Sequence, residues 1–326
     1  MLPSVWRTRR AEGVPHVPVL PREVVDLLDP RPGATVVDGT FGAGGHARLL
    51  AEHMGGRGAY IGIDRDPTVV EHFRGFRDAY PDMSIRLLRA DFRDGLAELV
   101  ARGVRADAVL LDLGVSSMQI DDADRGFAYA TDAPLDMRMD PEAPRSAADL
   151  VNTLDERALA DIFHRFGEER YARPIARAIV RRRATTPYTR SHELVETIRA
   201  AIPAPAQFGH GHPAKRVFQA LRIAVNDELA ALEEGLAAAI RVLRPGGRLV
   251  VLTYHSLEDR IVKRALREAA KGCTCPPSFP ICRCGKKPSL ALATRHSIAA
   301  GESEIGANPR ARSARLRAAV RLEAAA

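Results

Sequence analysis

The sequence predicts an α/β fold in which a large, mostly helical segment interrupts a doubly wound, mainly parallel sheet. Two observations support this class. Short apolar runs alternate with helical stretches, and these runs hold few polar residues, as expected for strands that are covered on both faces. The interval from Asp112 to Arg248 spans 136 positions, whereas a strand-to-strand crossover needs only about 30 residues.

Five of the apolar runs are expected to be strands of one sheet. They span residues 34–38, 59–64, 84–88, 107–112 and 248–253. A helix is expected to begin near His46, and this repeated strand–helix–strand order is typical of doubly wound sheets. Residues 315–322 alternate weakly and are expected to form a late edge strand. Residues 271–311 are rich in Pro, Gly and Cys, and we expect them to be irregular.

The interrupting segment is expected to form a domain of its own. Residues 145–215 are rich in Ala, Arg and Glu and contain no strand-like run, so we predict that they are mostly helical. Residues 217–243 are expected to form one long helix that returns the chain to the sheet. The chain is therefore divided into a discontinuous domain, 1–120 and 216–326, and an inserted domain of about 121–215.

Composition and charge limit the function classes. The 326 residues are 46% hydrophobic and 27% charged, which is ordinary for a globular protein. The net charge of +7 permits a nucleic-acid partner without proving one. Residues 120–150 hold eight acidic and three basic side chains, whereas residues 151–222 hold thirteen basic and seven acidic. This basic part, with Arg181–Arg183, is either a solvated helix face or a surface that contacts phosphates.

We expect a cytoplasmic protein without a membrane partner. No run approaches the roughly 20 apolar residues of a membrane span, and no apolar stretch follows the N-terminal arginines. All four cysteines lie in one short segment, which excludes a disulfide-stapled secreted protein. Their spacing leaves zinc, metal-free thiols or a redox pair open. These residues are Cys273, Cys275, Cys282 and Cys284.

A glycine-rich loop, residues 38–46, follows the first predicted strand. Its glycines allow a tight turn and allow a ligand to lie against bare main chain, although a turn without a ligand is the alternative. A P-loop is excluded because no Gly-Lys-Ser/Thr follows. Asp64 ends the second strand, 26 residues after Asp38, where a carboxylate can accept both hydroxyls of a ribose or simply cap a helix.

A third candidate site, Asp112–Ser117, follows the fourth strand. Open α/β sheets bind their ligands at the carboxyl ends of the strands. Carboxylates at three strand ends, Asp38, Asp64 and Asp112, would favour an adenosine cofactor that carries a positive charge. The alternative for Asp112 is a turn or cap residue.

The motifs around these sites resemble the RsmH/MraW family of ribosomal RNA small-subunit methyltransferases. The resemblance runs from residue 16 to about residue 315. The sequence departs from the family pattern at Met118, where proline is common, and at Tyr254, where phenylalanine is usual. The matching motifs are residues 16–20, 38–46, 63–67, 111–117, 124–127, 134–140, 171–180, 218–223, 255–260 and 308–313.

The resemblance implies a class I (Rossmann-like) methyltransferase sheet that binds S-adenosylmethionine. Gly44, Gly45 and His46 would contact the methionine part of the cofactor. Asp64 would hold the ribose, and Phe92 would lie beside the adenine. Two further residues would complete the site: Asp112 and Gln119.

The resemblance also implies the substrate, the exocyclic N4 of a decoding-centre cytidine in 16S rRNA. The small ribosomal subunit is then the partner, DNA is not, and monomer and homodimer both stay open. Cytosine N4 is a poor nucleophile because its lone pair is delocalised, so a group that accepts its hydrogens should assist. The candidates are Asp112, Ser116, Ser117, His255 and Ser256, and none is assigned as a general base. Methyl transfer needs no metal.

Two other functions also fit part of the sequence. An NAD-dependent dehydrogenase on a Rossmann fold would explain the glycine loop and Asp64, but it leaves the motifs at the fourth and fifth strands without a role. A non-catalytic RNA-binding protein that keeps the fold is the second alternative.

Overall fold

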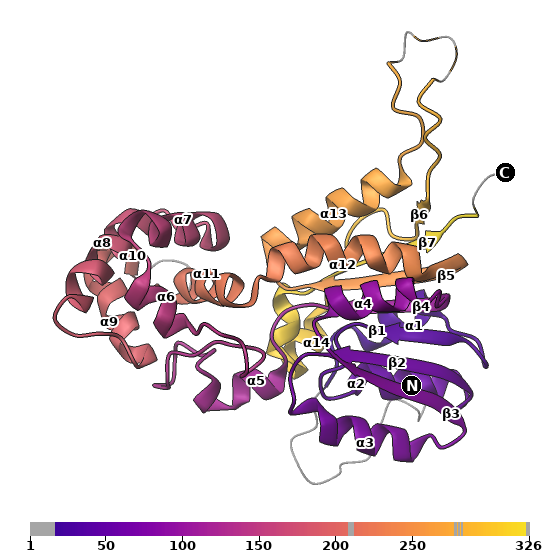
Figure 1. The fold of residues 1–326 in the computed structure, drawn as a ribbon, viewed down its shortest axis with the longest axis horizontal. Helices are drawn as coiled ribbons and strands as arrows, with labels where there is room; N and C mark the ends of the chain where they lie inside the picture. The colour runs from indigo at the N-terminus through magenta and orange to yellow at the C-terminus, as the bar shows by residue number, and fades with distance from the viewer. Residues whose placement is uncertain (1–16, 208–211, 277–278, 280, 282, 324–326) are drawn as a thin grey trace.

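The computed structural model describes residues 17–323 except 208–211, 277–278, 280 and 282, and it leaves the side chains of Ser117 and Ala206 undescribed. Figure 1 shows two parts: a sheet with helices on both faces, and a helical lobe that extends from one end of it. The predicted α/β class with a helical insertion between the fourth and fifth strands is confirmed.

The sheet has seven strands in the order β3-β2-β1-β4-β5-β7-β6. The first five strands of that order are parallel, and β7 pairs antiparallel with both β5 and β6. The strand order reverses between β1 and β4, which is where doubly wound sheets bind ligands. The strands are β1 Thr35–Asp38, β2 Gly58–Asp64, β3 Met83–Arg89, β4 Ala106–Asp112, β5 Leu243–Thr253, β6 Leu290–Leu292 and β7 Arg315–Arg321.

Alternating strand residues enter two separate cores, one on each face of the sheet. Val36 packs in the core beneath α1 (Pro21–Leu28), α2 (Gly45–His53) and α3 (Val69–Ala79). Its neighbour Val37 packs in the core beneath α4 (Phe92–Ala101), α12 (Glu228–Val242) and α13 (Ser256–Ala270). Because successive strand residues point to opposite faces, burial on both sides produces the continuous apolar runs of the sequence.

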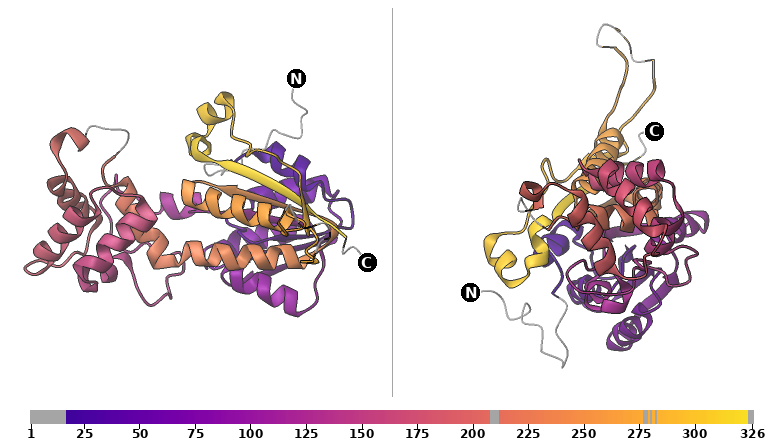
Figure 2. Two further views of the ribbon diagram at one scale, coloured as in Figure 1. Left: turned by 90° about the horizontal axis from the view of Figure 1, so that it is seen from above. Right: turned by 90° about the vertical axis from the view of Figure 1, so that its left-hand side faces the viewer.

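The helical lobe has a third hydrophobic core, which includes Phe163, Ile175 and Leu221. Two of its helices begin at side-chain caps, where Ser146 and Asp155 accept hydrogen bonds from main-chain N–H groups. Figure 2 shows this lobe beside the sheet rather than over it. Its helices are α6 Ala147–Thr153, α7 Glu156–Gly167, α8 Ala172–Arg183, α9 Ser191–Ala201, α10 Ala204–Gln207 and α11 Lys215–Asn226. The shorter α5 (Ser117–Asp121) leads into the lobe.

Three expectations about the second half of the chain are wrong. The predicted return helix is two helices, α11 and α12, because Asp227 between them adopts a left-handed conformation with φ 51°. The last strand, β7, is not an edge strand, because β6 pairs along its outer side. Residues 271–311 are not wholly irregular, since they contain β6 and α14 (Glu302–Ala307).

Candidate functional site

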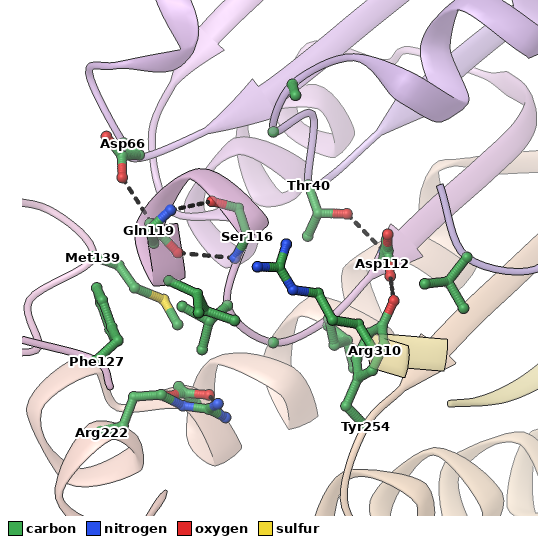
Figure 3. Close-up of a pocket in the computed structure, with 18 of the residues that line it drawn as sticks. Thr40, Asp66, Asp112, Ser116, Gln119, Phe127, Met139, Arg222, Tyr254 and Arg310 are labelled. Carbon is green, nitrogen blue, oxygen red and sulfur yellow. Dashed lines mark hydrogen bonds and ion pairs between the residues drawn. The ribbon is translucent and has the colours of Figure 1, made fainter. Parts of the chain in front are cut away.

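A cavity of about 780 Å³ lies where the carboxyl ends of the parallel strands meet the helical lobe. Its size is typical of sites that hold a cofactor together with a substrate group. The glycine loop, three strand ends, α11 and the segment after β5 all line it, and Figure 3 shows the side chains that meet there.

The glycine loop presents bare main chain to this cavity. Gly44 has φ 74°, and a Cβ atom there would stand 2.9 Å from the ring of Phe41, so only glycine fits the turn that starts α2. Gly45 and His46, the next two residues, line the cavity, whereas Gly44 does not. The structure therefore places two of the three predicted loop residues at the cavity and gives the third a conformational role.

Two buried carboxylates stand at the ends of β1 and β2. Asp38 accepts a hydrogen bond from the Tyr60 hydroxyl at 2.8 Å, and Asp64 accepts one from the main-chain N–H of Gly42 at 2.8 Å. Burial raises the pKa of Asp38 to about 6, although the Tyr60 hydrogen bond opposes it. Burial likewise raises the pKa of Asp64 to about 6. A positively charged ligand would favour the ionised form of both groups.

Asp112, at the end of β4, is held from two sides. Its main-chain N–H donates to the hydroxyl of Thr40 at 2.6 Å, and its Oδ1 accepts a hydrogen bond from the Tyr254 hydroxyl at 2.7 Å (Figure 3). Burial first, and then the Asp112 carboxylate, raises the pKa of Tyr254 well above its usual value, so the phenol stays neutral and donates. The other carboxylate oxygen lies 3.5 Å from Nε2 of His46.

Phe92 and Gln119, two of the residues expected at the cofactor site, also line the cavity. The ring of Phe92 lies against Gly235 of α12, where a Cβ atom would overlap it. Gln119 is buried, and its Nε2 donates to Asp66 at 2.7 Å while its Oε1 accepts from the main-chain N–H of Ser116 at 3.0 Å (Figure 3). Met118, beside it, does not disturb this arrangement.

The remaining candidates for the catalytic step differ in position. The hydroxyl of Ser116 accepts a hydrogen bond from the N–H of Gln119 at the start of α5, and Ser116 lines the cavity. His255 lines it too, but its ring lies 3.2 Å from Glu258. Ser256 is not a lining residue, and it donates to Glu168 of the helical lobe at 2.9 Å. The side chain of Ser117 lies outside the described part of the structure.

A buried charged cluster on the cavity wall was not predicted as a unit. Arg222 of α11 donates to both carboxylate oxygens of Glu228 at 2.8 Å. Burial alone would raise the pKa of Glu258, but the hydrogen bond from His255 and the charge of Arg222 hold it below its usual value. Glu228, His255 and Glu258 bring ligand atoms within 4.8 Å of one another, and Arg222 already pairs with one of the two carboxylates, that of Glu228. In the sequence, the only signal of this cluster was that the motifs 218–223 and 255–260 contain Arg222, His255 and Glu258.

The arginine run of α8 is largely structural. Arg182 stacks 4.6 Å over the ring of Tyr188, and Arg183 donates to the carbonyl of Val151 at 2.6 Å. Only Arg181 of the three is exposed. Among the described residues of the lobe, Lys215 at the start of α11 is the basic residue that lines the cavity outside the charged cluster.

Comparison with known proteins assigns this fold and site to a family. The sequence profile of the MraW methylase family matches residues 13–322. "Ribosomal RNA small subunit methyltransferase H" of Geobacter sulfurreducens is 53% identical over 310 residues, 94% of this chain and 99% of that protein. The protein of the same name from Heliobacterium modesticaldum is 50% identical over 310 residues, 94% of this chain and 98% of that protein.

These matches cover nearly the whole chain and decide among the three functions weighed above. A dehydrogenase and a non-catalytic RNA-binding protein are both contradicted by identities of about half with methyltransferases. In the described residues, no helix is long and apolar enough to cross a bilayer. The chain belongs to the MraW methylase family.

Proposed function

We propose that this protein uses S-adenosylmethionine to methylate the N4 atom of a decoding-centre cytidine, cytidine 1402, in 16S rRNA. The observation that carries the proposal is the cavity itself. It joins the glycine loop and the strand-end carboxylates to a basic helix of the lobe. The names of the relatives support an rRNA substrate in the small subunit.

The cofactor would occupy the sheet end of the cavity. When bound, it supplies an activated methyl group on a positively charged sulfur. Asp64 would accept the ribose hydroxyls, and Phe92, held against Gly235, would form an apolar wall for the adenine. Gly45 and His46 would lie beside the methionine part. The buried carboxylates suit the cofactor's positive charge.

Asp112 is the side chain best placed to assist the amine. A carboxylate that accepts a hydrogen from N4 localises its lone pair and stabilises the positive charge that develops during transfer. The Tyr254 hydroxyl orients one oxygen of Asp112, which prepares the group for this task without further rearrangement. Ser116 lines the same wall, whereas Ser256 points to the lobe.

The lobe would position the RNA. Lys215, Phe218 and Gln219 of α11 reach the cavity and can contact a phosphate and an unstacked base. We therefore place α11 with the inserted domain, because its apolar face packs in the core of the lobe, and draw the inserted domain over about 121–226. The protein would act on the small ribosomal subunit in the cytoplasm.

The decisive experiment supplies the purified protein and labelled cofactor to 16S rRNA that lacks the modification, both as naked RNA and within assembled subunits. Mass spectrometry of the digested RNA should find N4-methylcytidine at the proposed position. Methylation of another atom or another nucleotide would overturn the substrate assignment. Absence of cofactor binding in calorimetry would overturn the cofactor assignment separately.

A further inference from the structure

The four cysteines have no part in the proposed methyl transfer. The three described cysteines, Cys273, Cys275 and Cys284, lie in the two arms of a hairpin that links α13 to β6 and projects from the body of the protein (Figures 1 and 2). The N–H of Ser289 donates to the carbonyl of Ala269 at 2.8 Å and closes its base. None of the described cysteines lines the cavity.

We propose that Cys273, Cys275 and Cys284 bind a structural zinc ion at this hairpin. Their sulfur atoms all lie within 4.8 Å of one another. The sulfurs of Cys273 and Cys284 are 3.7 Å apart. Two thiolates bound to tetrahedral zinc at about 2.3 Å are separated by roughly 3.8 Å, so this edge already has the span that the metal requires. Cys282 lies outside the described residues.

Main-chain N–H groups point at all three sulfurs. Cys275 donates to the sulfur of Cys273 at 3.4 Å, Thr274 to that of Cys284 at 3.3 Å, and Arg283 to that of Cys275 at 3.3 Å. Main-chain N–H groups commonly donate to the sulfurs of metal-bound cysteines. They also fix the direction of each sulfur before the ion arrives. These hydrogen bonds are a second observation in favour of a metal site, separate from the distances between the sulfurs.

The described residues of the hairpin form no apolar core that would hold it. Its large apolar side chains are exposed, 75% for Ile281 and 48% for Phe279. A small loop without a core commonly depends on a staple, and metal binding contributes directly to folding in such elements. Thiolates select zinc over Mg²⁺ and Ca²⁺, which prefer oxygen ligands. The site is structural because methyl transfer is assembled elsewhere.

Metal analysis of the full-length chain tests the site. After incubation with zinc and dialysis against a weak chelator, the wild-type protein should retain close to one zinc per chain. Cys273→Ser and Cys284→Ser should each lower that content at least tenfold, because each removes a ligand. Thr274→Ala is the matched control: it lies between two ligands, keeps its main-chain N–H and should retain the zinc of the wild type.

A second measurement separates metal loss from misfolding. Trypsin cleavage after Arg283 should be slow with zinc and faster after chelation in the wild type, while circular dichroism shows that the body stays folded. Substitution with Co²⁺ should give the absorption of tetrahedral thiolate coordination. A wild-type protein that retains less than a tenth of an equivalent, serine variants that hold full zinc, or a Cys273–Cys284 disulfide in the unreduced protein would overturn the proposal.

Discussion

The two ends of the cavity are built in different ways. At the sheet end, Asp38, Asp64 and Asp112 are the last residues of three parallel strands, and the fold brings strand ends together by itself. At the lobe end, Lys215 and Arg222 come from a helix whose position depends on the packing of a separate core. The first end follows from local sequence patterns, and the second follows from tertiary contacts.

The two ends also present different groups. The three strand-end carboxylates at the sheet end suit a positively charged cofactor, and the exposed Lys215 on the lobe suits a polyanion. Substitutions at the sheet end should therefore impair cofactor binding and the chemical step. Substitutions at the lobe end should impair RNA binding alone.

The largest effect is expected for Asp112→Asn. The amide keeps the shape of the side chain but loses the charge that stabilises the methylated amine, so kcat should fall by about 10²–10³-fold. Asp107→Asn, at the opposite end of the same strand and outside the cavity, is the matched control and should keep kcat. Single-turnover assays measure both variants, and an unchanged rate in Asp112→Asn would remove this residue from the mechanism.

Asp64→Asn should weaken cofactor affinity by roughly 10–100-fold, because the carboxylate pairs with the ribose hydroxyls. The pKa of Asp64, raised by burial to about 6, adds a pH dependence. Below pH 6 the carboxyl holds a proton, so wild-type affinity should fall about tenfold per pH unit for each such group and level off above pH 7. Calorimetry between pH 5 and 8 should show a shallower slope in Asp64→Asn, with Asp38 as the remaining source. An equally steep slope would contradict this assignment.

A pair of glycine substitutions tests the wall behind the adenine. Gly235→Ala should destabilise the fold by about 1–3 kcal/mol and weaken cofactor binding, because the new Cβ displaces the Phe92 ring. Gly75→Ala, at an exposed position of α3, meets nothing closer than 3.9 Å and should stabilise the fold by about 0.5–1 kcal/mol. Urea unfolding with and without cofactor distinguishes the two variants. If both changed the free energy of unfolding in the same direction, the packing of Phe92 against Gly235 would not explain the result.

The smallest effect is expected at the lobe end. Lys215→Ala should weaken RNA binding a few-fold and reduce the slope of log affinity against log salt by about 1, since one phosphate contact is lost. Cofactor affinity should not change. Arg181→Ala, on the exposed side of α8, is the control and should leave both affinities near the wild-type values. If Lys215→Ala weakened cofactor binding as well as RNA binding, the two ends of the cavity would not act independently.

Sequence patterns predicted the sheet well because burial on both faces leaves a continuous apolar run at each strand. They failed where two elements share one pattern. Residues on both sides of Asp227 have a helical pattern and predict one helix, although α11 packs in the core of the lobe and α12 packs on the sheet. The pairing of β6 with β7 joins residues about 30 apart through an irregular segment, which alternation alone cannot reveal.

The candidate site divides in the same manner. Motif position locates strand and helix ends, and four residues expected at the cofactor site line one cavity: Asp64, Phe92, Asp112 and Gln119. The pairing of Arg222 with Glu228 depends on the unpredicted turn at Asp227, and the contact of Ser256 with Glu168 depends on how the lobe docks. The docking of the lobe depends on surfaces from segments that are distant in the sequence, so a single sequence does not predict it.

Asp227, the left-handed residue that joins α11 to α12, is the point about which α11 would rotate. The helix has 12 residues and is therefore about 18 Å long, so a swing of 10° about this pivot would carry its far end by roughly 3 Å. Arg222, five residues from the pivot, would travel only about 1 Å over the same arc. A small change at Asp227 would therefore move Lys215, at the far end of α11, much more than Arg222.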